Sequence, residues 1–112
     1  MSAVLSPDAV RGLQEDVGDD AARGFVATFL AMLEARVDRV RAAVELDDAA
    51  TAHVAALSLH SSSAMVGAHA LAELGRALSA ALRCGAVGPA RALLPELMIL
   101  AAATAAALLA LF

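Results

Sequence analysis

Residues 56–68 read Ala-Leu-Ser-Leu-His-Ser-Ser-Ser-Ala-Met-Val-Gly-Ala, and two helical stripes run through this stretch and the turn before it. Side chains spaced by three and four residues share one face of a helix. The stripe that we expect to face the core comprises Ala52, Ala56, Leu59, Ser63 and Val66. The stripe that we expect to face outward comprises His53, Leu57, His60 and Ala64. The pattern predicts a helix over about residues 48–66, interrupted at Gly67.

Helical signals continue on both sides of this stretch, and no segment alternates apolar and polar residues with the period of a strand. Ser6-Pro7-Asp8 is typical of a helix start and predicts a short helix to about Asp16. A second helix is expected from about Asp20 to Val44. Its predicted core stripe is Phe25, Phe29, Met32 or Leu33, Val37, Val40 and Val44.

The remaining helices are bounded by similar signals. Asp47 is expected to cap the third helix, and Gly85 is expected to end the fourth, near Arg83, in a left-handed conformation. The predicted core stripe of the fourth helix is Leu71, Leu74, Leu78 and Leu82, and the last helix opens at Gly88-Pro89. Short loops between long helices predict antiparallel neighbours. We therefore expect one all-α domain over 1–112, an up-and-down four-helix bundle with a short extra N-terminal helix.

Composition excludes several classes of function. The chain has 112 residues, a net charge of −4, and arginine as its only basic residue apart from histidine, in positions that form no basic stripe. We therefore expect no nucleic-acid partner. Cys84 is the single cysteine and cannot form an internal disulfide, which predicts a reducing cytoplasm. Its thiol is expected to be buried or half-buried. No signal peptide is recognised at the start. The apolar run from Leu97 to Phe112 is shorter than a membrane span needs, so none is predicted.

The 56–68 stretch resembles the core of the histidine-containing phosphotransfer (HPt) domain family, which reads roughly A-H-x-L-K-G-S-S-A-x-x-G-A-x-x-L. The positions that match this pattern without a gap are Ala56, Leu59, Ser62, Ser63, Ala64, Gly67, Ala68 and Leu71. The short first helix, the phenylalanine pair in the second, and the Arg-Cys-Gly end of the fourth are also similar to this family. The resemblance implies a bacterial two-component signalling module whose partners are a response-regulator receiver domain and a sensor histidine kinase.

The departures from the family pattern carry as much information as the matches. In this register the phosphorylated histidine of the family falls on Leu57, the family's lysine on His60, and its glycine on Ser61. Phosphotransfer needs a neutral imidazole nitrogen as the nucleophile, and leucine has no nucleophilic atom. The leading hypothesis is therefore a module that docks a receiver domain without passing phosphate through position 57. The predicted docking residues are His53, Leu57, His60, Ser61, Ala64 and Arg83.

Two alternative functions remain open from the sequence. His60, one helical turn from Leu57, is the candidate for a displaced phosphoacceptor, ahead of His53 and His69. The last helix is almost wholly apolar, with only Thr104 interrupting after Leu97. This indicates either a self-associating module or homodimer, or a fragment whose missing part covers the helix. Neither an enzyme active site nor a cofactor is predicted. His53 and His60 lack a third ligand in their stripe, so no metal site is expected either.

Overall fold

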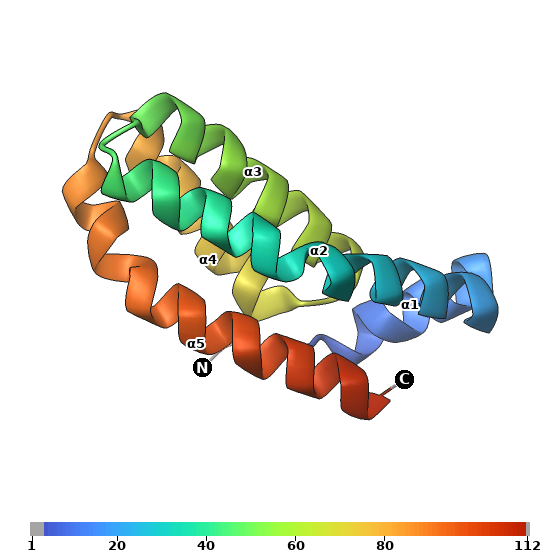
Figure 1. The fold of residues 1–112 in the computed structure, drawn as a ribbon. Helices are drawn as coiled ribbons and strands as arrows, with labels where there is room; N and C mark the ends of the chain where they lie inside the picture. The colour runs from blue at the N-terminus through green and yellow to red at the C-terminus, as the bar shows by residue number, and fades with distance from the viewer. Residues whose placement is uncertain (1–3, 112) are drawn as a thin grey trace.

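The computed structural model describes residues 4–111, and this part of the chain forms five helices and no strand (Figure 1). The helices are α1 (Pro7–Val17), α2 (Asp19–Glu45), α3 (Ala49–Met65), α4 (His69–Arg83) and α5 (Val87–Leu111). The predicted all-α bundle with a short N-terminal helix is confirmed. Phe112, the last residue of the apolar run noted in the sequence, lies outside the described residues.

Helices α2 to α5 form the bundle, and α3 and α5 occupy diagonal corners. Both pack against α2 and α4 (Figure 1). The large side chains that the core buries completely are Leu59, Leu71, Leu78, Leu97, Leu108, Val40 and Val44. Each fully buried leucine or valine contributes roughly 1.5–3 kcal/mol, so these residues supply much of the driving force for folding. The diagonal arrangement leaves α3 and α5 with separate solvent-facing surfaces.

The N-terminal segment is attached to the turn between α3 and α4. The Ser6 amide donates a hydrogen bond to the Gly67 carbonyl oxygen at 2.8 Å, and the Ser6 hydroxyl caps α1 by accepting from the Ala9 amide at 3.3 Å. Gly67 has a φ of +76°, and an added Cβ would lie 2.9 Å from Val10 Cγ2. Only glycine meets both requirements, because other residues disfavour positive φ and carry that Cβ.

The junction between α2 and α3 corrects one prediction. The N-cap of α3 is Asp48 and not Asp47: the Thr51 amide donates to Asp48 Oδ1 at 3.2 Å. Hydrogen bonding from Thr51 lowers the pKa of the Asp48 carboxyl, chiefly through the side chain and then the backbone. Asp47 instead adopts a left-handed φ of 56° and accepts from Arg91 Nη2 at 2.8 Å. Arg91 comes from α5, so the sequence around Asp47 alone gave no indication of this role.

Most of the predicted core stripes are buried, with two exceptions on α2. Phe25 is 42% exposed and Met32 is 45% exposed, so Phe25 was assigned wrongly, and Leu33 fills the position for which Met32 had been the alternative. Val26 is buried in place of Phe25, and it continues the buried series Ala22, Val26, Phe29 and Leu33 of α2. The prediction for Cys84 was also wrong, because this thiol is exposed just beyond the end of α4. Gly85 beside it has the predicted left-handed φ of +76°.

α5 begins at Val87, next to the start predicted at Gly88-Pro89. It continues through Pro95 for 25 residues, and its mean hydropathy reaches 2.0 over an 18-residue window. By length and composition alone it is the one helix within residues 4–111 that could cross a membrane. The helix is thus longer than its apolar run, and length alone does not exclude a span. In the fold, however, α5 completes the bundle, with Leu97, Thr104 and Leu108 fully buried.

Candidate functional site

Leu57 lies at the midpoint of α3, on the face that points away from the core. Its side chain is 43% exposed, whereas Leu59, two residues further on, is completely buried. The whole predicted inner stripe of α3 is buried, and the outer stripe is exposed or half-buried, as the spacing predicted. The solvent-facing midpoint of the helix therefore carries an aliphatic side chain between two histidines.

Both of these histidines are half-buried and held by α4. His60 Nδ1 lies 2.8 Å from the Ala72 carbonyl oxygen, and His53 Nδ1 lies 3.1 Å from the Ser79 carbonyl oxygen and 3.1 Å from its Oγ. Because a carbonyl oxygen only accepts, each Nδ1 is assigned as the N–H donor. In the neutral ring the lone pair is then on Nε2. Contacts with α4 hold both rings, so their orientation depends on how α3 and α4 pack together.

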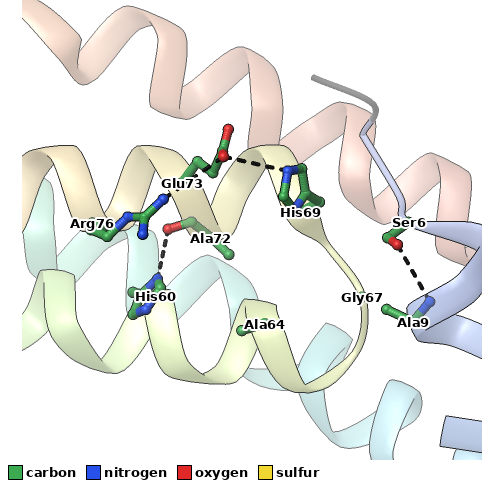
Figure 2. Close-up of a pocket in the computed structure, with 9 residues that line it drawn as sticks. All are labelled: Ser6, Ala9, His60, Ala64, Gly67, His69, Ala72, Glu73 and Arg76. Carbon is green, nitrogen blue, oxygen red and sulfur yellow. Dashed lines mark hydrogen bonds and ion pairs between the residues drawn. The ribbon is translucent and has the colours of Figure 1, made fainter. Parts of the chain in front are cut away.

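His60 lines a shallow pocket of about 260 Å³ between α3, α4 and the start of α1 (Figure 2). Three ionisable residues of α4 share it: His69, Glu73 and Arg76. Glu73 Oε1 lies 3.4 Å from His69 Nε2 and 3.8 Å from Arg76 Nη2. The pocket thus combines one imidazole from α3 with an imidazole, a carboxylate and a guanidinium from α4.

The other predicted docking residues, Ser61, Ala64 and Arg83, lie at different points along α3 and α4. Ser61 and Ala64 are exposed on α3 beside His60. Arg83 is exposed at the end of α4, one turn beyond Ser79, which places it toward the His53 end of α3. Arg76 is the basic residue that lies near His60 (Figure 2), and the sequence argument missed it. Its only sequence signal was its place three residues after Glu73, which predicts a shared helix face.

The part of the chain that the structure describes contains no group of three histidine, cysteine, aspartate or glutamate side chains arranged to hold a metal ion. The side chains of the site offer imidazole nitrogens, a guanidinium, a carboxylate and an apolar surface.

The fold and sequence match known proteins across nearly the whole chain. The family model described as the Hpt domain matches residues 24–109. The chain belongs to the Hpt domain family. Hpt domains are phosphotransfer modules of phosphorelays, with kinases and receiver domains as partners, so the family suggested by the 56–68 stretch is confirmed.

A solved structure supports the same assignment. The crystal structure of histidine-containing phosphotransfer protein B (HptB) from Pseudomonas aeruginosa PAO1 is similar to this Hpt domain, with a TM-score of 0.87 and 25% sequence identity. The match covers 96% of this chain and 93% of that chain. A comparison with curated proteins gave no significant match.

The close approach of α3 and α4 at this site depends on Gly75. A Cβ added there would lie 2.9 Å from the His60 amide nitrogen and 3.1 Å from its Cα. We expect Gly75→Ala to destabilise the fold, because forcing the two backbones apart costs about 1–3 kcal/mol. This cost outweighs the gain of up to ~1 kcal/mol from replacing a helical glycine. Urea unfolding measures the change, and the His60 ring signals in NMR report the loss of the Ala72 hydrogen bond.

Gly24→Ala is the matched control, because Gly24 is also helical and an added Cβ there meets nothing within 4 Å. We expect this control to be neutral or stabilising by up to ~1 kcal/mol. Equal effects of the two substitutions would contradict the close helix approach at Gly75.

Proposed function

We propose that this Hpt domain docks a receiver domain through the solvent-facing side of α3 and passes no phosphate at position 57. The observation that carries the proposal is the exposed aliphatic side chain of Leu57 at the midpoint of that helix. Its counterpart in the family pattern is the phosphorylated histidine.

The chemistry of transfer explains why the side chain at this position matters. An imidazole nitrogen attacks the phosphorus of a receiver aspartyl phosphate, the P–N bond forms, and the P–O bond to the aspartate breaks as the carboxylate leaves. Leucine offers only C–H bonds and has no lone pair with which to begin this step. The module would therefore act as a competitor of active phosphotransfer domains or as an adaptor, with no enzymatic activity of its own.

The surface of α3 is suited to binding another protein. No charged residue occurs between Ala49 and Met65, and Val54 and Met65 are 65% and 60% exposed on either side of Leu57. An apolar surface of this kind favours a protein partner, because burying it stabilises the complex by about 25 cal/mol for each Å² of apolar area removed from water. Ser61 and Ala64 are small, so a partner can approach the helix closely.

The exposed thiol of Cys84 fits a reducing cytoplasm, which is the compartment that we propose.

A binding titration with phosphorylated and unphosphorylated receiver domains of the source organism tests docking. We expect Leu57→Glu to weaken receiver binding by about tenfold or more, because an unpaired carboxylate would be desolvated at the centre of the interface. Leu109→Glu is the matched control, since Leu109 is 68% exposed on α5 at the diagonal corner of the bundle. Equal receiver binding by wild type and Leu57→Glu would contradict docking through this face.

His60 is the basis of the second candidate function, an active phosphotransfer protein with a displaced acceptor. The hydrogen bond from Nδ1 to the Ala72 carbonyl leaves Nε2 with the lone pair required of a nucleophile, and His60 lines a pocket that also contains Arg76. A guanidinium there would stabilise a transferred phosphoryl group. Against this candidate, the shift of one helical turn moves the nucleophile by about 5 Å, while in-line transfer tolerates errors nearer 1 Å.

Incubation with a phosphorylated receiver domain separates the two candidates. Acid-labile, base-stable phosphate that appears on the wild type and disappears in His60→Ala, but persists in His53→Ala, would establish the displaced acceptor. Binding without any label is the result expected of the docking module.

A further inference from the structure

We propose that the face formed by α2 and α5 is a two-fold symmetric interface with a second copy of this chain. This side of the bundle is opposite the side formed by α3 and α4, which carries the histidine pocket, so the proposal is independent of receiver docking. It gives a location and a symmetry to the self-association that the apolar last helix suggested.

The solvent-facing side of α5 is the first observation. The chain has no charged residue after Glu96, and the one polar side chain, Thr104, is completely buried. Beyond Glu96 the exposed side of α5 is therefore entirely apolar, with Met98 44% exposed, Ile99 70% and Leu109 68%. A helix that faces water on one side normally carries polar residues there. Continuous apolar surface of this extent marks an interaction site.

A groove between α2 and α5 is the second observation. It has a volume of about 540 Å³, and its α5 wall is formed by Met98 and the small residues Ala101, Ala102 and Ala105. Small side chains let a helix of another molecule approach closely. The α2 wall carries Leu30, Leu33 and Val37 and the charged residues Glu34, Asp38 and Arg41.

The positions of those charges indicate that the occupant is a second copy. Glu34 and Arg41 lie seven residues apart on the groove side of α2, which is about 10 Å or two turns. A two-fold axis perpendicular to α2 midway between them brings Glu34 of each copy to Arg41 of the other. In a two-fold interface the same patch must complement itself, and an acidic and a basic residue placed symmetrically about one point meet that condition. Asp38 lies next to that point, and Arg41 of the same chain pairs with its carboxylate at 2.9 Å.

The available area is sufficient for a stable dimer. α5 has 25 residues and α2 has 27, so each is about 40 Å long and, with side chains, about 10 Å wide. Together they offer on the order of 800 Å² per copy, which equals the ~800 Å² per partner of standard interfaces.

A lipid bilayer is the alternative occupant, and the groove argues against it. Glu34, Asp38 and Arg41 border the apolar surface, and Asp38 and Arg41 already form an ion pair at 2.9 Å. A bilayer would have to desolvate these groups, or α5 would have to leave the bundle and expose the buried contacts of Leu97 and Leu108.

Sedimentation equilibrium of the full chain over a range of concentrations tests the proposal, with circular dichroism to confirm that every variant folds. We expect a monomer–dimer equilibrium for the wild type. Ala102→Glu should raise the dimer dissociation constant by about tenfold or more, because two unpaired carboxylates would meet near the axis. Leu57→Glu, on the α3 face, should leave the dimer unchanged.

Charge reversal provides the sharper test of symmetry. E34R and R41E should each weaken the dimer, because each places like charges opposite one another across the axis. The double variant E34R/R41E should recover the wild-type dissociation constant. The proposal would be overturned if the wild type were monomeric at every concentration, or if it co-sedimented with phosphatidylcholine vesicles in place of self-association. It would also be overturned if Ala102→Glu left the dimer dissociation constant unchanged, or if the double variant dimerised no more tightly than the single variants.

Discussion

Leu57→His is expected to give this protein a phosphotransfer activity that the wild type lacks at that position. The substitution places an imidazole at the solvent-facing midpoint of α3, which is the acceptor position in the proposed register. Because Leu57 is already 43% exposed, the replacement leaves the core intact and costs only the small difference in helix propensity. The measurement is the transfer of labelled phosphate from a phosphorylated receiver domain, detected as acid-labile, base-stable label.

The Leu57→His variant is best tested in a His60→Ala background, because this removes any phosphate label that His60, the candidate displaced acceptor, would carry. Val54→His is the matched control, since Val54 is a 65% exposed aliphatic residue one turn before Leu57, so an imidazole there is displaced by about 5 Å along the same helix. Label on Leu57→His alone is the expected result. Equal label on the two variants, or none on Leu57→His despite intact receiver binding, would show that position 57 is not the acceptor position of this domain.

Leu59→Ala is expected to cause the largest loss of stability among the substitutions considered for α3. Leu59 is completely buried in the core between α2 and α4, and truncating a buried leucine to alanine costs about 2–5 kcal/mol through lost burial and the cavity left behind. For a domain of this size the melting temperature should fall by about 10 °C or more. Chemical unfolding and calorimetry measure both quantities.

Leu57→Ala is the matched comparison, because the chemical change is identical and the site is two residues away on the same helix. Its exposed side chain loses little on truncation, so we expect less than about 1 kcal/mol of destabilisation, together with weaker receiver binding. Similar losses of stability at the two positions would mean that α3 is rotated relative to the core from the orientation described.

Several parts of this molecule could be predicted from the sequence because they depend on short-range periodicity. The two faces of α3 follow from spacings of three and four residues, and the four-leucine stripe of α4 does likewise. Local capping chemistry located the start of α1 at Ser6 and the left-handed Gly85. Each of these features is decided by residues within about one or two turns of one another, so the printed order of amino acids is enough to find them.

Other features depend on residues that only the tertiary fold brings together. Asp47 forms its ion pair with an arginine 44 positions away, and Asp48 is left as the cap of α3. The orientation of the His60 ring depends on the Ala72 carbonyl of α4, and its close approach to that helix depends on Gly75. The exposure of Phe25, the proximity of Arg76 to His60 and the unpaired outer face of α5 likewise reflect how the helices pack. Helix periodicity determines which side of a helix is apolar, but the packing of whole helices decides which neighbour, if any, covers that side.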